Sequence, residues 1–256
     1  MVKELTRLLV VGGSGFIGRH IVAYAVSLGW DVTSLGISEL VAESESTGVR
    51  YVSADITNCD DLRRAIGSLS FEYVVNCGGY IDHSNFFNGG NRFIDAHYGG
   101  VVNLVKVLDR TVLRSFVNIG SSDEYGNAPA PQLETVREAP ISPYSFGKVA
   151  STHFLQMLYR TEQFPATTLR LFLTYGPGQD SKRFFPQIIL GCLGGNSFPT
   201  SHGEQLRDFC YVGDTVDAIF KCFASPLAKG QVINVGSGQA VPIRQMIETV
   251  VGLIGR

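Results

Sequence analysis

At 256 residues, of which 45% are hydrophobic and 17% charged, the chain can bury a full core and is too apolar to be disordered. A net charge of −2 gives no reason to expect nucleic acid or an anionic membrane as a partner, and no uncharged apolar run reaches the ~18 residues of a membrane-spanning helix. The five cysteines are odd in number and never form a CxxC pair, so we expect a cytoplasmic protein without a disulfide framework or a metal site.

The first predicted element is a strand, residues 8–11, that leads through a glycine-rich turn into a helix. Glycine in such a turn can adopt a positive φ, lets the backbone approach a pyrophosphate, and allows the helix to pack closely on the strand. The helix N-terminus then faces the anion. A glycine-rich turn without a ligand is the alternative, but its position between a strand and a helix favours a dinucleotide site. The predicted cofactor-binding residues of this turn are Gly12, Gly15, Phe16, Ile17 and Gly18.

The end of the second predicted strand, residues 30–35, bears on the choice of cofactor. In NAD-binding units an acidic side chain at this position binds the ribose hydroxyls, but here the position is Gly36, and Glu39 comes too late. Without a carboxylate to repel it, a 2′-phosphate could fit, held by Ser38 and Arg19. The sequence therefore favours NADP over NAD, although the arginine that usually follows this strand is missing.

A third strand, residues 49–52, is followed by Asp55 and Ile56, which we predict to contact the cofactor. The Asp55 carboxylate could accept a hydrogen bond from the adenine amino group. It could equally cap the helix that begins near Asn58, and both interpretations stay open.

The fourth strand, residues 73–76, opens into small residues that include Gly78, where the backbone could run beside the cofactor. The polar segment 82–92 is expected to be a mobile loop over the site, and a helix over residues 93–108 precedes a fifth strand over residues 114–119. This alternation of strands and helices with short connections predicts a doubly wound parallel sheet, a Rossmann-like α/β fold. Ligands then lie beyond the carboxyl ends of the strands.

The fifth strand ends in Ser121 and Ser122, whose hydroxyls could cap a turn or hydrogen-bond a substrate carbonyl. After a proline-rich loop, Tyr144 and Lys148 stand four residues apart at a helix start, which puts both side chains on one helical face. The Tyr144–Lys148 pair alone is weak evidence of a catalytic site, but its position after a serine-bearing strand end strengthens that evidence.

The last third of the chain is less regular. A sixth strand covers residues 166–173, and beyond residue 183 the alternation loosens, apart from a late strand over residues 232–235. We expect residues 1–182 to form the dinucleotide-binding domain. Residues 183–256 are expected to be mainly a substrate-binding region, with segments that return to the sheet.

Taken in order, these motifs resemble the extended short-chain dehydrogenase/reductases that act on nucleotide sugars, the NAD-dependent epimerase/dehydratase family. Segments 120–126 and 176–179 are most similar to the 4-ketoreductases of 6-deoxy sugar nucleotides, such as GDP-4-keto-6-deoxy-mannose reductases and CDP-abequose synthases. The resemblance rests on Gly12-x-x-Gly15-x-x-Gly18, Asp55, residues 76–79, Ser121-Ser122, Tyr144-x-x-x-Lys148, Arg170, residues 175–179, residues 207–209, Asp214 and residues 234–238.

The sequence also departs from the family's pattern. Leu173 and His97 stand where these enzymes commonly carry asparagine, and Gly78 and Gly79 replace the usual alanines. The chain stops short of the family's C-terminal segment, so part of the substrate pocket is expected to be absent.

The resemblance implies hydride transfer between a nicotinamide and C4 of a hexose, with Ser121, Tyr144 and Lys148 as the catalytic residues. Tyr144 would be the acid/base, and the Lys148 ammonium would favour its phenolate and so lower its pKa. Lys148 would also hold the nicotinamide ribose, and Ser121 would hydrogen-bond the C4 oxygen.

Substrate binding is assigned in the same way. Arg207 and Arg183 are candidates to bind the pyrophosphate of a nucleotide sugar, because a guanidinium pairs well with phosphate oxygens. A structural role for Arg207 beside Asp208 is the alternative. The expected substrate-binding residues are Ser122, Asp123, Tyr144, Arg183 and Arg207.

An NADPH-dependent nucleotide-sugar 4-ketoreductase is the favoured function, because of the motif similarity and the missing carboxylate at Gly36. An NAD-dependent 4-epimerase would share the catalytic residues but usually shows the acidic strand end. A 4,6-dehydratase needs a further acid/base pair, of which the sequence retains only Asp123. A non-catalytic dinucleotide-binding protein is the remaining alternative.

We also expect a homodimer, because related enzymes commonly pair through the helices that correspond here to residues 93–108 and 144–162. Core packing explains the apolar residues of these helices equally well. The residues concerned are Leu104, Val105, Leu108, Phe154, Leu155 and Leu158.

Overall fold

Seven parallel strands form the main sheet of the computed structural model, which describes residues 5–37, 48–195 and 202–255. The strands are β1 (Arg7–Val11), β2 (Asp31–Gly36), β3 (Val49–Ser53), β4 (Tyr73–Asn76), β5 (Ser115–Ser121), β6 (Ala166–Leu171) and β9 (Val232–Val235). Their order, β3-β2-β1-β4-β5-β6-β9, shows that the chain builds one half outward from β1 and then returns to build the other. The predicted Rossmann-like, doubly wound sheet is therefore confirmed.

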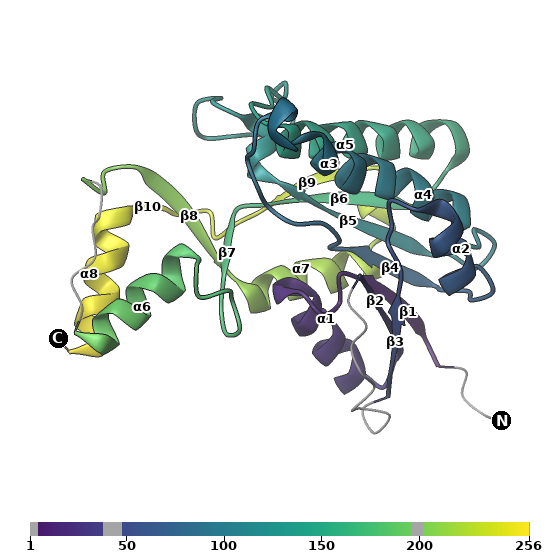
Figure 1. Ribbon diagram of the computed structural model, residues 1–256, viewed down its shortest axis with the longest axis horizontal. Coiled ribbons are helices and arrows are strands. Elements are labelled where there is room, and N and C mark those ends of the chain that lie inside the picture. The colour runs from purple at the N-terminus through teal and green to yellow at the C-terminus, as the bar shows by residue number, and fades with distance from the viewer. Residues whose placement is uncertain (1–4, 38–47, 196–201, 256) are drawn as a thin grey trace.

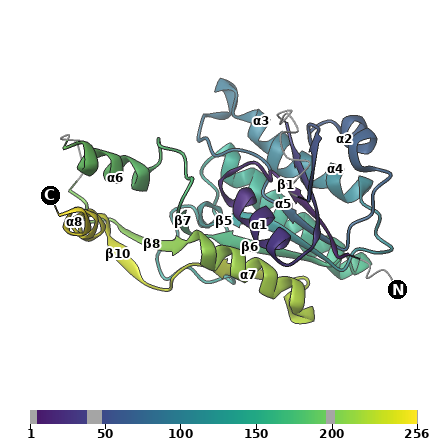
Figure 2. The same ribbon diagram turned by 90° about the horizontal axis from the view of Figure 1, so that it is seen from below.

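Helices cover both faces of this sheet (Figure 1). The larger ones are α1 (Phe16–Ser27), α2 (Cys59–Ile66), α4 (Gly100–Val107), α5 (Pro143–Glu162) and α7 (Val212–Ala224). Helices α2, α4 and α5 lie on one face, and α1 and α7 lie on the other. Figure 2 shows α1 and α7 side by side, and the rings of Tyr24 and Phe220 meet between them at 4.6 Å.

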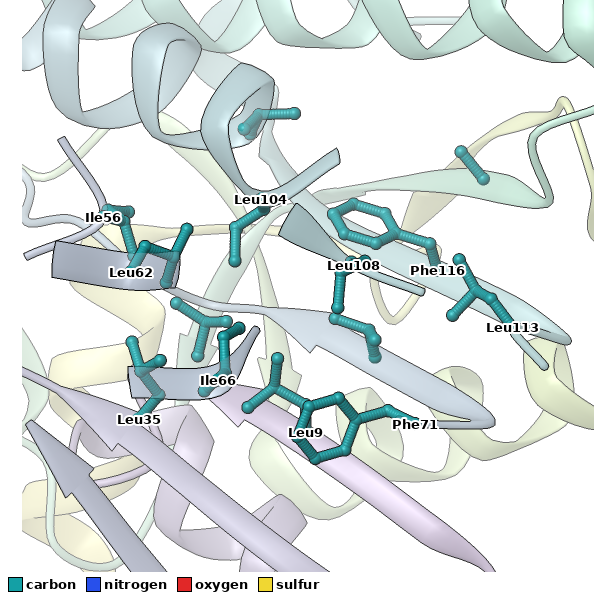
Figure 3. Close-up of a cluster of buried hydrophobic side chains, with 14 of the residues drawn as sticks. Leu9, Leu35, Ile56, Leu62, Ile66, Phe71, Leu104, Leu108, Leu113 and Phe116 are labelled. Carbon is teal, nitrogen blue, oxygen red and sulfur yellow. The ribbon is translucent and has the colours of Figure 1, made fainter. Parts of the chain in front are cut away.

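The core is divided between these two faces because successive side chains of a strand point in opposite directions. From β1, Leu9 and Val11 join the cluster under α2, α4 and α5, part of which Figure 3 shows. Leu8 and Val10 join the cluster under α1 and α7. Each of these side chains is at most 1% exposed, and burial of a side chain of this size stabilises the fold by about 1.5–3 kcal/mol. The continuous apolar run of β1 is thus explained by a strand that is covered on both sides.

A second, smaller unit follows the main sheet. Its described elements are β7 (Leu173–Tyr175), β8 (Leu206–Tyr211), β10 (Ala240–Pro242), α6 (Phe184–Gly194) and α8 (Ile243–Ile254). The three strands form a sheet in the order β10-β8-β7, and the two helices pack against each other. Because β7 begins two residues after β6 ends, this unit lies beyond the carboxyl end of the main sheet, on the left in Figure 1. The chain returns to the main sheet in α7 and β9, and a domain boundary at residue 182 stays a prediction.

The prediction of one long sixth strand over residues 166–173 is wrong. β6 ends at Leu171, and β7 belongs to the smaller sheet, where it pairs with β8. Phe172 lies between the two strands, and its N–H donates to the Val235 carbonyl oxygen of β9 at 3.0 Å. An unbroken apolar run does not mark the point at which a strand leaves one sheet for another.

The predicted helix over residues 93–108 exists but is not uniform. It consists of a short α-helix, α3 (Asn91–Ile94), a π-helical turn, η3 (Asp95–Gly99), and α4. Single π-helical turns inside α-helices frequently occur at functional sites. His97 lies in this turn, and its side chain is directed to the candidate site described below.

The segment over residues 82–92, predicted as a loop, contains regular turns. It forms a 3-10 helix, η2 (Phe86–Asn88), and then enters α3. The Asp82 carboxylate accepts hydrogen bonds from the Ser84 N–H at 2.7 Å and from the Ser84 hydroxyl at 2.6 Å. Phe87 at its tip is 95% exposed.

Most of the residues proposed for a dimer surface are buried within the protomer. Leu104, Leu108, Leu155 and Leu158 are at most 7% exposed and belong to the core cluster. The core interpretation is therefore correct for these four leucines, while Val105 and Phe154 are partly buried against the same cluster. Within the described residues, no helix has both the length and the hydrophobicity that crossing a membrane requires.

Candidate active site

The glycine-rich turn after β1 is shaped by close backbone contacts. Gly12 has a φ of +76°, and a Cβ at this position would lie 2.9 Å from the Cys77 carbonyl oxygen. A Cβ on Gly18 would overlap the Gly12 carbonyl oxygen, so α1 packs on the turn at a distance that only glycine permits. The Gly15 N–H donates to the same Gly12 oxygen at 2.9 Å.

The N-terminus of α1 is open to an anion. Gly15 is the N-cap, no side chain caps the helix, and its first turn contains no acidic residue. The first backbone hydrogen bond is donated by Arg19 N–H to the Gly15 carbonyl at 3.0 Å, which leaves the N–H groups of Phe16, Ile17 and Gly18 without an intrahelical acceptor. A twelve-residue helix with this start, preceded by a glycine-rich turn, fits the pyrophosphate of a dinucleotide.

At the end of β2 there is no carboxylate, as the sequence predicts. A Cβ on Gly36 would meet the Ser14 hydroxyl oxygen at 3.5 Å, an ordinary contact, so the position has room for a side chain. Arg19 folds back over the glycine turn, and its guanidinium donates to the carbonyl oxygens of Ser14 at 3.3 Å and Gly15 at 3.4 Å. Ser38, the other residue proposed for a 2′-phosphate, lies outside the described residues.

The proposal that Asp55 caps the helix after β3 is wrong. Asn58 is the N-cap of α2, and its side chain accepts from the N–H groups of Asp60 and Asp61, both at 3.1 Å. The Asp55 carboxylate instead accepts from the Thr57 N–H and hydroxyl, both at 2.8 Å, because it comes three residues too early to reach the first turn of the helix. Contact of Asp55 with adenine stays a prediction.

Ile56 follows β3 and Gly78 follows β4, and the two residues lie next to each other. Ile56 is 6% exposed, and a Cβ on Gly78 would come within 3.1 Å of its Cδ1. A Cβ on Gly100 of α4 would approach the same atom at 2.7 Å. The Ile56 side chain therefore fills space between glycines, so any cofactor contact of this residue is expected from its backbone.

Ser121, Tyr144 and Lys148 are brought together by β5 and α5. Tyr144 and Lys148 lie one turn apart on the buried face of α5 and are 3% and 6% exposed. The Ser121 hydroxyl, at the end of β5, is hydrogen-bonded to Tyr144. The Lys148 ammonium donates to the Ile119 carbonyl at 2.5 Å and lies 5.9 Å from the centroid of the Tyr144 ring.

Burial dominates the electrostatics of this group. It raises the pKa of Tyr144 to about 12, with additional contributions from the charges of Asp123 and Glu124 and an opposing one from the Ser121 hydrogen bond. Burial also lowers the pKa of Lys148 to about 8, although Glu124 opposes this. In the protein alone, burial in α5 has the largest effect on the pKa of Tyr144, and Tyr144 stays protonated. That Lys148 favours the phenolate stays a prediction.

A buried ionic network supports the serine end of the site. It is centred on η4 (Ser122–Tyr125), the 3-10 helix after β5, where Glu124 accepts from the Ser121 N–H at 3.0 Å. The other Glu124 oxygen accepts from Arg170 at 2.9 Å and from the Thr152 hydroxyl of α5 at 3.0 Å. Arg170 and Glu124 are both 0% exposed. The network fixes the end of β5 relative to α5.

His97 has a position at the site to which sequence reasoning assigned no role. Its ring meets that of Tyr144 edge to face at 4.9 Å, and its Nε2 lies 3.1 Å from the Tyr80 carbonyl oxygen. Burial lowers the pKa of His97 to about 3, so it is neutral, with the proton on Nε2. Its buried Nδ1 has no hydrogen-bond partner among the described residues. A Cβ on Gly79 would overlap the ring, which explains glycine there.

His83 is a second residue that the sequence did not single out. Its ring lies edge to face with Tyr144 at 5.6 Å, and its Nε2 is 3.8 Å from an oxygen of Asp123. The sequence offered no signal for the contact between His83 and Asp123. These two residues are 40 positions apart, and His83 stands in a polar segment without regular periodicity.

Of the predicted substrate-binding residues, Ser122 and Asp123 lie in η4 at the site, and both are partly buried. Arg183 is the exposed N-cap residue of α6, and its charge acts to lower the pKa of Tyr144. Arg207 in β8 is exposed and donates to the Leu206 carbonyl at 2.8 Å.

Asp208 does not support the structural interpretation of Arg207. Its carboxylate accepts from the Ser237 N–H at 2.7 Å, the Ser237 hydroxyl at 2.8 Å and the Gly238 N–H at 2.9 Å. Neighbouring residues of a strand point to opposite faces, so Arg207 and Asp208 are directed apart.

Known proteins share this architecture. The model of the NAD dependent epimerase/dehydratase family matches residues 8–236. The bifunctional UDP-glucose 4-epimerase and UDP-xylose 4-epimerase 1 of Pisum sativum is 23% identical over an alignment that covers 96% of this chain and 81% of the relative. The dTDP-glucose 4,6-dehydratase of Escherichia coli is 27% identical, with 90% and 72% covered. The solved structure of a dTDP-glucose 4,6-dehydratase from Streptomyces venezuelae with NAD bound has the same fold, with a TM-score of 0.84 at 22% identity and 98% and 81% covered.

The family model thus covers the glycine turn, the Ser121, Tyr144 and Lys148 group, and the end of the main sheet. The chain belongs to the NAD dependent epimerase/dehydratase family, whose members are enzymes of the extended short-chain dehydrogenase/reductase type.

Proposed function

We propose that the protein is an NADPH-dependent 4-ketoreductase of a nucleotide-activated 6-deoxy sugar. The observation that carries this proposal is Gly36 at the end of β2, where a carboxylate would otherwise bind the ribose hydroxyls of NAD and repel a 2′-phosphate. Arg19 lies over the neighbouring turn and is the proposed partner of such a phosphate.

The protonation of the site suits reduction of a carbonyl. A bound nicotinamide cofactor supplies the hydride, and the protein must supply the proton. Tyr144, with its pKa raised to about 12, is a protonated donor at neutral pH, and the Ser121 hydroxyl lies beside it to hydrogen-bond the carbonyl oxygen. Lys148, anchored on the Ile119 carbonyl, is the candidate to hold the nicotinamide ribose.

The smaller unit is proposed to bind the nucleotide part of the substrate. Arg183 and Arg207 are exposed on α6 and β8, which lie beyond the carboxyl end of the main sheet, where ligands of such sheets bind. Exposed guanidinium groups there can pair with a pyrophosphate. Ser122 and Asp123 are the proposed contacts to the sugar.

A 4-epimerase or 4,6-dehydratase using NAD is the second candidate. It is favoured by the relatives named above, which are a 4-epimerase and 4,6-dehydratases, and by the NAD bound in the dehydratase structure. The same Ser121, Tyr144 and Lys148 group would serve these reactions. Retention of an oxidised NAD between turnovers, rather than consumption of NADPH, distinguishes them from a reductase.

The cofactor proposal is tested by fluorescence titration of NADPH and NADH. The wild type is expected to bind NADPH more tightly, and Gly36→Asp is expected to reverse the preference, because the added carboxylate repels the 2′-phosphate and binds the ribose hydroxyls. Gly36→Asn is the matched control: it has nearly the same size without the charge and should not create a preference for NADH. Tighter binding of NADH by the wild type would refute the NADPH proposal.

We further propose a homodimer, supported by exposed apolar side chains around η3 and α5. Tyr98, Phe146 and Met157 are 37%, 49% and 42% exposed. Sedimentation at micromolar concentration should give a dimer mass that Met157→Glu reduces toward the monomer; a monomeric wild type would refute this proposal.

A further inference from the structure

A chain of hydrogen bonds runs through the interior from the backbone at Gly78 to the backbone at Lys148. The Gly78 N–H donates to the Asn76 side-chain oxygen at 3.1 Å, and the Asn76 amide group donates to the Asn118 side-chain oxygen at 2.9 Å. The Asn118 amide group donates to the Ser151 hydroxyl oxygen at 3.4 Å, and that hydroxyl donates to the Lys148 carbonyl oxygen at 2.8 Å. Asn76, Asn118 and Ser151 are 4%, 1% and 0% exposed, so these bonds are shielded from water.

The two ends of this chain fix the direction of every bond in it. A backbone N–H can only donate, so the Asn76 oxygen must face Gly78 and the Asn76 amide group must face Asn118. A backbone carbonyl can only accept, so the Ser151 hydroxyl must donate to Lys148 and receive its own hydrogen bond from Asn118. Because all the bonds run in one direction, they polarise one another, and the side chains have a single consistent orientation.

The sheet itself does not require polar side chains at these positions. Asn76 and Asn118 are paired in the register of β4 and β5. Each follows, by two residues, an apolar side chain of the core cluster under α2, α4 and α5, namely Val74 and Phe116, and therefore lies on the same face of the sheet. Apolar side chains could continue that face, whereas a buried amide pair has to find all its partners in the interior. A role in orientation explains why amides stand here.

Both ends of the chain lie at the proposed active site. A Cβ on Gly12 would lie 3.1 Å from the Gly78 nitrogen, so this amide is beside the glycine turn that fits a pyrophosphate. At the other end, Lys148 is held twice: its carbonyl accepts from Ser151, and its ammonium donates to the Ile119 carbonyl of β5 at 2.5 Å. The chain thus links the cofactor side of the site to the turn of α5 that carries the ammonium.

We propose that Asn76, Asn118 and Ser151 are positioning residues, which set the Lys148 ammonium at a fixed place relative to the backbone at Gly78. This inference rests on the proposed function, in which Lys148 holds the nicotinamide ribose and the backbone near Gly78 runs beside the cofactor. The three side chains act through these two residues and take no part in proton or hydride transfer. Misplacement of a group at an active site by about 1 Å can lower a rate ~10²-fold.

The titration of Lys148 reports the position of its ammonium without any substrate or cofactor. Burial lowers its pKa to about 8. The charged and titratable groups that face it are Glu124 of η4, Cys77 after β4, His97 of η3 and Tyr144 of α5. The pKa of His97 is lowered to about 3, and those of Cys77 and Tyr144 are raised to about 12, so these three groups keep their charge while Lys148 titrates. A change in the Lys148 pKa therefore reports a change in the burial of its ammonium.

The test is a ¹³C NMR titration of protein labelled at the lysine ε-carbon, with the Lys148 signal identified by its absence from Lys148→Met. The wild type is expected to titrate near pH 8. Ser151→Ala and Asn118→Leu interrupt the chain, so they should let water reach the ammonium and raise its pKa by about 1, toward its ordinary value of 10.5. Ser115→Ala is the matched control, because Ser115 is a buried serine of β5 whose hydroxyl has no hydrogen-bond partner among the described residues. This variant should titrate like the wild type.

Kinetics and cofactor binding measured on the same proteins separate this inference from the proposed function. Thermal unfolding first shows that the variants are folded; Ser151→Ala, which removes one oxygen atom, suffices for the test if Asn118→Leu does not fold. In the folded variants, kcat for NADPH oxidation with a 4-keto-6-deoxy nucleotide sugar should fall at least ~10-fold, with KM for the sugar within a few-fold of the wild type. Ser115→Ala should keep wild-type values.

An unchanged Lys148 pKa, or a wild-type kcat in the folded variants, would overturn the positioning role, whatever their stability. If the wild type consumes no NADPH with the keto sugar, the proposed function is refuted. The raised Lys148 pKa, together with weaker NADPH binding by Ser151→Ala in a fluorescence titration, would then still support the positioning role.

Discussion

We propose Tyr144 as the proton donor, because burial keeps its hydroxyl neutral. Tyr144→Phe keeps the ring that packs against His97 and removes only the hydroxyl. We expect cofactor binding to survive and turnover to fall by at least ~10² to 10⁴, the usual contribution of general acid catalysis. Ser121→Ala should cost less, because it removes one hydrogen bond to the carbonyl. Steady-state NADPH oxidation and cofactor fluorescence measure the two effects separately; unimpaired turnover of Tyr144→Phe would contradict the assignment.

Lys148 should give the reaction a pH dependence above neutrality. Its pKa is lowered to about 8, so the ammonium that we propose to hold the ribose loses its proton as the pH rises through that value. We expect kcat/KM for reduction to fall above about pH 8, and Lys148→Met to lower the rate and abolish this dependence. A wild-type profile that is flat to pH 10 would show that the charge of Lys148 is not required.

The lowered pKa of Lys148 also makes the stability of the protein depend on pH. The unfolded chain retains the lysine proton up to its ordinary pKa of 10.5, whereas the folded protein releases it near 8. Between these values the unfolded state binds more protons, so the contribution of Lys148 to the free energy of unfolding rises with pH and is smallest below 8. Below about pH 8, the buried ammonium beside Tyr144 therefore lowers the free energy of unfolding.

That Ser121, Tyr144 and Lys148 come together at one site was predictable from the sequence, but the electrostatics of this group were not. Ser121, Tyr144 and Lys148 stand at recognisable positions on a strand end and a helix start. The pKa of Tyr144 depends instead on how completely α5 is covered, and that is a property of the folded chain. His83 and Asp123 meet across 40 residues of sequence for the same reason.

At the scale of elements, the Glu124 network ties η4, α5 and β6 together. Glu124→Gln keeps the shape but leaves the buried Arg170 guanidinium with less compensation, so we expect the free energy of unfolding to fall by about 3 kcal/mol. Asp60→Asn, which breaks the exposed pair with Arg63, is the matched control and should cost less than about 1 kcal/mol. Urea unfolding measures both; equal losses would contradict a supporting role for the network.

Elements with a clear periodicity were predicted well, and the exceptions have physical causes. The strands of the main sheet lie within a residue or two of their expected bounds, because apolar runs bounded by glycine and polar turns are distinctive. The split of β6 from β7 was missed because Leu173 continues the apolar run. The π-helical turn at His97 was missed because it depends on contacts with Tyr80 and Tyr144, which come from other segments.

At the scale of the molecule, the doubly wound sheet follows from alternating strands and helices with short connections. That arrangement brings the glycine turn after β1 and Ser121 after β5 to one edge of the sheet. The assembly of the smaller unit beyond this edge (Figure 1) could not be predicted, because its elements α6 and β8 are separated in sequence from β10 and α8 by α7 and β9. The exposed positions of Arg183 and Arg207 on that unit became apparent only from the structure.

The most direct test of the proposed reductase is product analysis with two substrates, a 4-keto-6-deoxy nucleotide sugar and, separately, its unmodified parent nucleotide sugar. We expect the keto sugar to be reduced at C4 with one NADPH consumed per product, and the parent to be left unchanged. Dehydration of the parent, or its epimerisation at C4 without net consumption of cofactor, would contradict it.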